Sequence, residues 1–139
     1  MKIAFAAAAI LALYILGADG AWAQLVACGG AQKPHQVVEL MFGRNIADRI
    51  AVTEGEWTRF VDQEITPRFP DGVTVFRAAG QRRDQSSNRI VREPTNIVLI
   101  VLPGKAEELE RVNEITQAYK VRFKQQSVGV ILHPACVSF

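Results

Sequence analysis

The sequence contains little of what builds a metal site or a covalent catalytic site. It has only two cysteines and two histidines, and neither residue type occurs in a CxxC or HxxxH spacing. Because such spacings typically supply zinc ligands, the sequence predicts no metal site, and nothing in it calls for a cofactor. A Gly-x-Ser-x-Gly elbow and a phosphate-binding glycine loop are also missing. Whether the protein is an enzyme therefore stays open at the level of the sequence.

An excess of charge of one sign is absent as well. Lys and Arg together number 16 and Asp and Glu 14, which gives a net charge of +2. Proteins that coat nucleic acid need a dense basic surface, so this balance argues against a nucleic-acid partner. The apolar content of 49% is typical of a globular protein, and 139 residues is the length of one domain.

The longest uninterrupted apolar run lies at the N-terminus and has the pattern of an export signal. Residues 3–16 are uncharged and apolar, but a bilayer-spanning helix needs roughly 20 such residues. Residues 17–20 break the run, and the triplet Ala-Trp-Ala that ends at residue 23 carries small residues where a signal peptidase cuts. The sequence predicts a signal peptide over 1–23 and a periplasmic or secreted single domain over 24–139. No transmembrane segment is expected after cleavage.

Cys28 has two alternative interpretations. The segment Leu25-Val26-Ala27-Cys28 has the form of a lipobox, in which Cys28 would carry a lipid anchor. Alternatively, Cys28 pairs with Cys136, since two thiols in a small exported domain are usually joined. The bridge would close a loop of about 107 residues and contribute roughly 4–5 kcal/mol in the chain-entropy model. We expect the disulfide, because the apolar run ends far before Cys28.

Hydrophobic periodicity predicts six elements in the mature chain. Thr53 and Glu56 form a capping box at the start of the first helix, and Pro67 ends that helix near Thr66. The third strand is expected to break near Pro94. The element order is typical of a ferredoxin-like β-α-β-β-α-β sandwich of the α+β class, with one antiparallel sheet and both helices on one face. Strands are expected over 35–43, 73–83, 89–102 and 127–132, and helices over 53–66 and 105–125.

The second face of this sheet is predicted to be apolar and uncovered by helices. The first and third strands are apolar on both faces, so we expect them in the centre of the sheet. An apolar face of this extent is rarely left in water, and a homodimer that closes sheet on sheet is favoured. Coverage by residues 24–34 and 133–139 is the alternative. The side chains predicted for this face are Val37, Met41, Val75, alternate members of 97–102, and Ile131 or Val130.

Charged residues in two places are candidates for a polar site. Glu39 lies among apolar neighbours, where a carboxylate needs a partner. A salt bridge with Arg77, Arg92 or another guanidinium is the structural interpretation, and an acid, base or ligand anchor is the functional one. Around one hairpin lie four arginines that would suit a small anionic ligand, namely Arg82, Arg83, Arg89 and Arg92.

Several motifs taken together resemble one family. They are Glu39-Leu40-Met41-Phe42-Gly43-Arg44, Trp57 with Phe60, Thr66-Pro67-Arg68-Phe69-Pro70-Asp71-Gly72, Arg92-Glu93-Pro94, and Ser138-Phe139 after Cys136. As a set they resemble a small secreted bacterial family known as a domain of unknown function, DUF3574. The resemblance implies an exported protein and no established activity. The family also has a Gly-Gln-x-Arg segment, which here is Gly80-Gln81-Arg82-Arg83. By this resemblance the candidate ligand-binding residues are Glu39, Arg44, Arg68, Arg83, Arg92 and Glu93.

The function expected from the sequence is an exported, non-catalytic binding or assembly module that dimerises through its open sheet face. The alternative is a small periplasmic enzyme or organic-acid-binding protein. In that case Glu39 would be the acid, base or anchor, and Arg83 and Arg92 would hold an anion.

Overall fold

A computed structural model describes residues 27–46, 49–50 and 52–139. The predicted signal peptide over 1–23 lies outside the described residues. Along the chain the elements are β1 (Lys33–Gly43), β2 (Asn45–Ile46), β3 (Arg49–Ile50), α1 (Glu54–Phe60), the π-helical turn η1 (Val61–Ile65), β4 (Thr74–Arg83), β5 (Ile90–Leu102), α2 (Ala106–Phe123) and β6 (Gly129–Val137).

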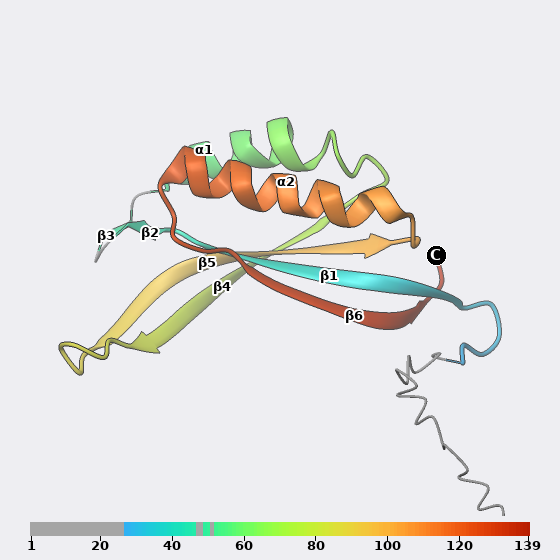
Figure 1. Cartoon of the computed structure of the whole chain (residues 1–139), viewed down its shortest axis with the longest axis horizontal. Coiled ribbons are helices and arrows are strands. Elements are labelled where there is room, and N and C mark those ends of the chain that lie inside the picture. Colours follow the sequence, from blue (N-terminus) through green and yellow to red (C-terminus); the bar gives the residue numbers. More distant parts are fainter. Residues whose placement is uncertain (1–26, 47–48, 51) are drawn as a thin grey trace, which may run out of the picture.

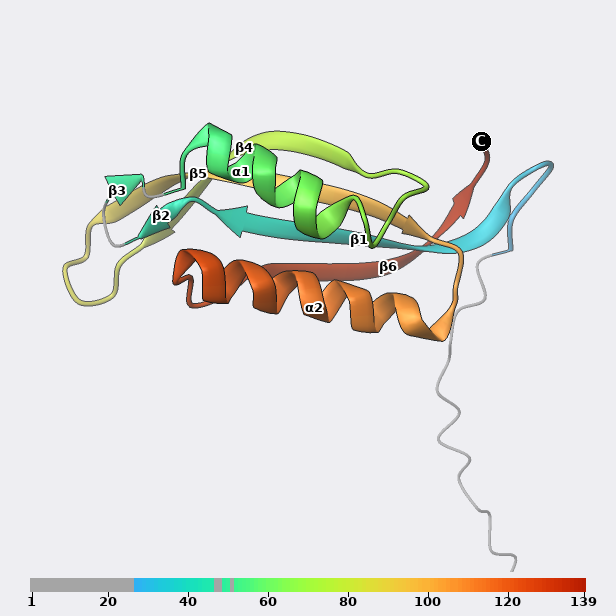
Figure 2. The same cartoon turned by 90° about the horizontal axis from the view of Figure 1, so that it is seen from above.

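The four long strands form one antiparallel sheet with the order β4-β5-β1-β6. The central strands are β1 and β5, as the apolar residues on both of their faces predict. The short strands β2 and β3 pair separately. Both helices lie over the same face of the sheet (Figures 1 and 2). The chain is therefore an α+β protein with one helical layer and one sheet layer.

The hydrophobic core lies between the helices and the sheet. Alternate residues of β1 and β5 are at most 1% exposed on this face. Aromatic rings from β1 and both helices pack beside them, with centroids 4.7 to 6.2 Å apart and mostly tilted or edge-on. This geometry adds ring-to-ring attraction to the free energy of burying apolar surface. The aromatic residues are Phe42, Trp57, Phe60, Tyr119 and Phe123.

The first helix begins and ends where its local sequence predicts. The Glu56 amide donates to Thr53 Oγ1 at 3.3 Å, and the Thr53 amide donates to the Glu56 carboxylate at 2.9 Å. These hydrogen bonds lower the pKa of Glu56, because they stabilise its ionised form. The helical run continues through η1 to a cap at Thr66, directly before Pro67.

The predicted break near Pro94 was wrong, because β5 runs through it without interruption. The Pro94 carbonyl accepts a hydrogen bond from the Arg44 amide at 3.0 Å. The nitrogen and the carbonyl of one strand residue point to the same side of the strand, so the missing N–H faces Arg44. That position lies just beyond the last β1–β5 pair, Gly43 with Thr95. A proline there removes no hydrogen bond between β5 and β4, and the strand tolerates it.

A disulfide joins Cys28 to Cys136. The last strand is longer than predicted, and Cys136 lies opposite Pro34 in the β1–β6 register. The bridge thus ties the segment before β1 to the edge strand of the sheet. It is compatible with an oxidising extracellular compartment.

We expect reduction of this disulfide to lower the free energy of unfolding. The bridged residues are 108 positions apart, and the chain-entropy model assigns roughly 4–5 kcal/mol to a loop of that length. Urea unfolding of residues 24–139 with and without a thiol reductant measures the difference. The double variant Cys28→Ser, Cys136→Ser is the control, and its midpoint should not respond to reductant. An unchanged wild-type midpoint would show that the bridge adds no stability.

Candidate functional site

The open face of the sheet, which is the face without helices, is defined by the strand register. Glu39 lies directly opposite Leu99 on β5 and Ile131 on β6. Residues that face each other across antiparallel strands put their side chains on the same side of the sheet. The register therefore shows which alternate residues of each strand belong to the open face.

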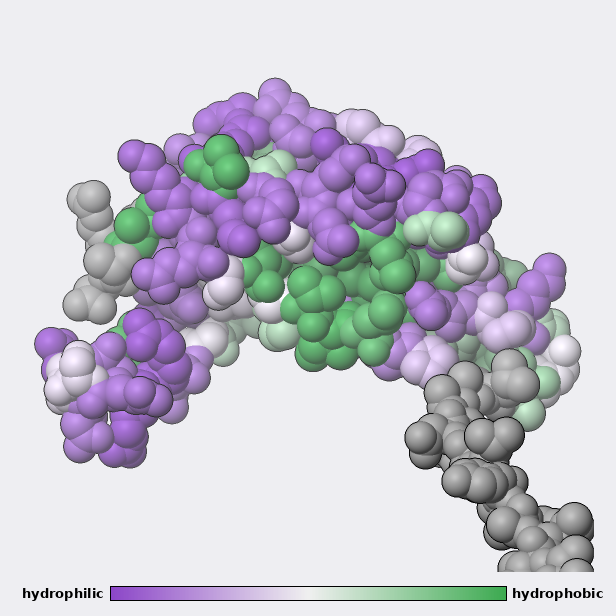
Figure 3. Space-filling view, in the orientation of Figure 1, coloured by the Kyte–Doolittle hydropathy of each residue, from purple (hydrophilic) through white to green (hydrophobic). Residues whose placement is uncertain are grey.

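Apolar side chains from all four strands meet on this face. We call them the open-face patch: Val37, which is only 6% exposed, and the more exposed Met41, Phe76, Ile97, Leu99, Val101 and Ile131. Phe76 on one edge strand is 49% exposed, and Ile131 on the other is 45% exposed. The described parts of the terminal segments 24–34 and 133–139 thus leave both margins of the patch uncovered. Figure 3 views the molecule from the β6 edge of the sheet and shows a hydrophobic area on this edge below the helices.

One residue predicted for the open face lies on the other side of the sheet. Val75 is opposite Val98, which is fully buried under the helices. Phe76 takes its place on the open face. Of the two alternatives on the last strand, the register selects Ile131 rather than Val130. An edge strand with neighbouring apolar residues does not reveal from sequence alone which of them faces the core.

Glu39 lies in the middle of the open-face patch and is partly buried there. The predicted salt bridge to Arg77 or Arg92 is not formed, since none of the ion pairs among the described residues includes Glu39. Arg77 instead contacts Glu54 at 2.6 Å. A carboxylate without a partner in an apolar surface adds a desolvation penalty when that surface is buried in an interface.

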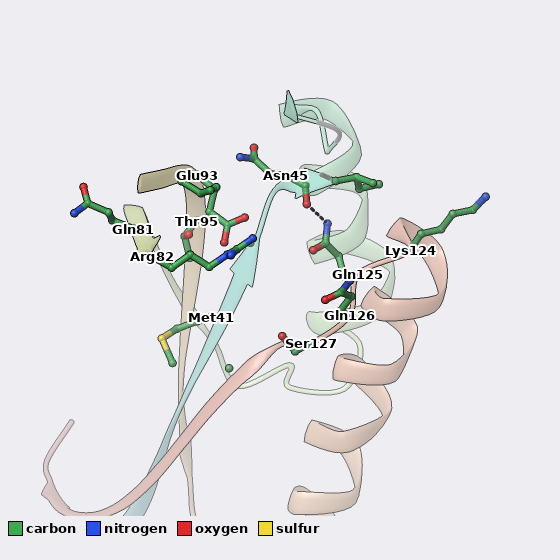
Figure 4. Close-up of a pocket in the computed structure, with 15 residues that line it drawn as sticks. Met41, Asn45, Gln81, Arg82, Glu93, Thr95, Lys124, Gln125, Gln126 and Ser127 are labelled. Carbon is green, nitrogen blue, oxygen red and sulfur yellow. Dashed lines mark hydrogen bonds between the residues drawn. The ribbon is translucent and has the colours of Figure 1, made fainter. Parts of the chain in front are cut away.

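A cavity of about 530 Å³ opens at the end of the open face next to the β4–β5 hairpin. We call it the Glu93 cavity. In Figure 1 the hairpin end of β4 and β5 bends away from the helices, and residues of both strands line the cavity. Glu93 and Thr95 of β5 and Arg82 of β4 line it together with residues of the segment after α2 (Figure 4). Its volume lies within the range of roughly 300–1,000 Å³ that is usual for small-molecule sites.

Three glycines leave room for the side chains that line the Glu93 cavity. A Cβ atom at Gly43 would lie 2.9 Å from Glu93 Oε2, and one at Gly80 would lie 2.9 Å from Thr95 Oγ1. A Cβ atom at Gly129 would lie 2.7 Å from the Met41 methyl carbon. Glycine within a strand often marks such a close approach. The three missing side chains therefore let the carboxylate, the hydroxyl and the thioether lie against the strands.

Two hydrogen-bond acceptors at the Glu93 cavity have no partner. No hydrogen bond or ion pair among the described residues reaches the Glu93 carboxylate. Asn45 donates through Nδ2 to the Arg92 carbonyl at 3.1 Å, but its buried Oδ1 accepts from nothing in the described chain. Buried acceptors are usually satisfied, so the Asn45 oxygen lacks an expected donor, while the partly buried Glu93 carboxylate lines the cavity without a partner among the described residues.

The structure does not bring the six candidate ligand-binding residues together. Arg44 donates to the Val52 carbonyl at 2.9 Å and contacts Glu54 at 3.0 Å. Arg83 donates to Asn88 at 3.1 Å within the hairpin. By register, Arg83 and Arg92 belong to the helix-side face, opposite to the face that carries Glu39.

Arg68 has a structural position between the two helices. It contacts Glu114 at 2.8 Å and Glu64 at 2.9 Å. The hydrogen bond with Glu114, followed by the one with Glu64, raises the pKa of this guanidinium. Among the six candidates, only Glu93 lines the Glu93 cavity, while Glu39 lies in the open-face patch.

Fold and site define the class as a small α+β protein with an apolar sheet face and a polar cavity at one end of it. Within the described ranges, no three potential metal-ligating side chains cluster, and no helix is long and apolar enough to cross a bilayer. Residues 37–139 match the family described as protein of unknown function, DUF3574. The chain belongs to this family, as its motifs suggest.

Comparison with other proteins adds the fold alone. None of the curated proteins compared with the chain matches it. A phage SAM lyase in complex with S-methyl-5'-thioadenosine is similar, with 17% identity, coverage of 83% of this chain and 95% of the lyase, and a TM-score of 0.58. The apo state of a phage SAM lyase is 19% identical, with coverage of 83% of this chain and 96% of the lyase and a TM-score of 0.56. CutA from Synechococcus elongatus PCC7942 is 12% identical, with coverage of 77% of this chain and 80% of CutA and a TM-score of 0.49.

Tyr119 holds the strand end that forms one wall of the cavity. Its hydroxyl donates to the Gly43 carbonyl at 2.8 Å, and the residue is fully buried. Burial raises the pKa of this phenol above its ordinary value of 10.0. The stabilisation that comes from keeping the phenol neutral is present below pH 10 and is lost as the pH rises above that value.

We therefore expect Tyr119 to resist ionisation in folded residues 24–139, where it is the only tyrosine. Ultraviolet absorbance should show no titration near pH 10 until the protein unfolds, and denaturant should restore an ordinary titration. The variant Tyr119→Phe should give no signal and should lose about 1 kcal/mol of unfolding free energy, because the hydrogen bond to Gly43 is gone. An ordinary titration in the folded protein would contradict the burial of Tyr119.

Proposed function

We propose that this protein is an exported, non-catalytic binding or assembly module that pairs with a second copy through its open-face patch. The observation that carries the proposal is that Phe76 and Ile131 stay about half exposed at the two margins of an apolar surface four strands wide. Soluble monomers rarely expose a contiguous apolar surface of this kind unless it is an interaction site.

A second copy suits the patch because a two-fold axis brings the same surface against itself. Four strands about 4.8 Å apart, with three rows of side chains about 6.8 Å apart, give a projected area of roughly 400 Å² per copy. A standard interface buries about 800 Å² per partner. The smaller area, together with the charge of Glu39 at its centre, favours a weak and reversible dimer.

We also propose that the fold is ferredoxin-like. The element order β-α-β-β-α-β and the sheet order β4-β5-β1-β6 support this assignment. Each helix connects two parallel strands that are not neighbours and crosses the same face of the sheet, as in that topology.

Export is proposed on two grounds. Residues 1–23 have the pattern of a signal peptide, and a disulfide between Cys28 and Cys136 persists in oxidising compartments. A periplasmic or secreted location accounts for both. A lipid anchor at Cys28 would require the sulfur atom that the bridge uses.

The alternative built on Glu39 and the arginines has less support. Glu39 and the pair Arg83 and Arg92 belong to opposite faces of the sheet. A second candidate activity comes instead from the fold, since a similar phage SAM lyase binds S-methyl-5'-thioadenosine. An acidic residue in the Glu93 cavity gives this candidate a site. Incubation of residues 24–139 with SAM tests it, and the absence of S-methyl-5'-thioadenosine among the products would contradict it.

Two neighbouring residues of β6 test the proposed dimer. Ile131 and Leu132 are 45% and 44% exposed but lie on opposite faces of the sheet. We expect Ile131→Asp to weaken dimerisation at least about tenfold, because a charge is buried in the interface. Leu132→Asp is the matched control and should dimerise like the wild type. Sedimentation equilibrium of residues 24–139 measures both dissociation constants.

Two outcomes would contradict the proposed dimer. One is a wild-type protein that stays monomeric at every concentration examined. The other is equal weakening by Ile131→Asp and Leu132→Asp, which would place the contact on the edge of β6 rather than on the open face.

A further inference from the structure

The Glu93 carboxylate accepts no hydrogen bond from the residues that the structure describes. Two donors on neighbouring elements are engaged elsewhere. The Tyr119 hydroxyl donates to the Gly43 carbonyl at 2.8 Å, and the Arg44 guanidinium binds the Val52 carbonyl and Glu54. Lys124 lines the same cavity, but its side chain points away from Glu93 in Figure 4. A partly buried carboxylate without a partner among the described residues is available to a ligand that enters the cavity.

A second acceptor lies at the same cavity. Asn45 Oδ1 is buried and has no hydrogen-bond partner in the described chain, while Asn45 Nδ2 is held by the Arg92 carbonyl at 3.1 Å. The Asn45 backbone carbonyl is held as well, by Gln125 Nε2 at 2.9 Å (Figure 4). These two contacts fix the residue, and its side-chain oxygen is buried beneath the cavity surface. The Glu93 carboxylate, which lines the cavity, favours a ligand group with several N–H donors, such as an ammonium.

Arg82 supplies the opposite charge at the same cavity. Its guanidinium points toward the space beside Glu93 in Figure 4, but the two groups form no ion pair. Its one ion pair among the described residues is a long contact of 3.4 Å to Asp84. Asp84 already accepts four hydrogen bonds from Ser86 and Ser87 through its other oxygen. Most of the five N–H donors of Arg82 therefore remain available to a carboxylate.

We propose that the Glu93 cavity binds a small zwitterion of the amino-acid type. The ligand's ammonium group lies on the Glu93 carboxylate, and its carboxylate lies on the Arg82 guanidinium. Charge-assisted hydrogen bonds of this kind are the strongest that a small polar site offers. A cavity of about 530 Å³ holds a free amino acid of any size.

The pairing of charges also selects against other ligand classes. A dianion would meet repulsion from Glu93, and a diamine would meet repulsion from Arg82. The site lies at the hairpin end of the open face, whereas the open-face patch occupies its middle. Met41 belongs to the patch and also lines the cavity, but the charged groups of the proposed site, Glu93 and Arg82, lie outside the patch, so ligand binding and dimerisation are separable by experiment.

Isothermal titration calorimetry of residues 24–139 tests the proposal. The probes are the free L-amino acids, with putrescine as a ligand without a carboxylate and glutarate as a ligand without an ammonium group. We expect at least one amino acid to bind at millimolar concentration or below, more tightly than putrescine or glutarate. Glu93→Gln should weaken this binding at least about tenfold, because the charge that holds the ammonium is lost.

Two further variants separate binding from folding. Glu110→Gln is the matched control, since Glu110 is exposed on α2 and does not line the cavity. This variant should bind like the wild type. Gly43→Ala places a Cβ atom 2.9 Å from Glu93 Oε2 and displaces the carboxylate without removing its charge. It should also weaken binding, with little change in the thermal unfolding midpoint, because the end of a flexible side chain can move.

The proposal is overturned if no amino acid binds, or if Glu93→Gln binds as tightly as the wild type. Tighter binding of glutarate than of any amino acid would also overturn it, since that would make the site an anion site of Arg82 alone. Binding by the Ile131→Asp variant is expected to match the wild type. A failed dimer prediction with intact amino-acid binding, or the reverse, would therefore tell the two proposals apart.

Discussion

Two helices can cover only one face of a four-stranded sheet, and this limit shapes the rest of the molecule. The covered face carries the aromatic cluster and side chains of β1 and β5 that are nearly inaccessible to water. Its burial supplies most of the stability of a domain of this size. The other face keeps the same central strands, which are apolar on both sides. Its chemistry is therefore available for contacts with other molecules.

The open face is divided into two zones by its own residues. In the middle, apolar side chains from four strands form a surface that is shielded from water when another apolar surface packs against it. The cost of burying Glu39 there limits the affinity of that contact. At the hairpin end, Gly43, Gly80 and Gly129 leave space, and polar atoms of Glu93 and Thr95 occupy it. The bend of the β4–β5 hairpin turns this end into a cavity. A module with both zones combines an assembly surface with a separate polar pocket.

The sequence predicted the α+β class, the central strands, the capping box and the cysteine pairing, because each follows from local pattern or from a count of two thiols. It misplaced Val75 and the break at Pro94, because both depend on the register between strands, which no single strand determines. Glu93 was found through its motif. Asn45 was missed, because its position depends on Gln125 some 80 residues later. Gly43 and Gly80 indicated a close approach by another group, but only the structure shows that these groups are Glu93 and Thr95.

Methyl NMR of residues 24–139 over a dilution series tests the central claim most directly, since it observes the open face residue by residue. The account predicts that the methyl signals of Ile97, Leu99 and Ile131 shift together as the protein is diluted. Those of Val130 and Leu132, on the opposite side of the same edge strand, should stay in place. Signals that are independent of concentration, or shifts confined to Val130 and Leu132, would contradict the claim that the open face is where this protein meets its partner.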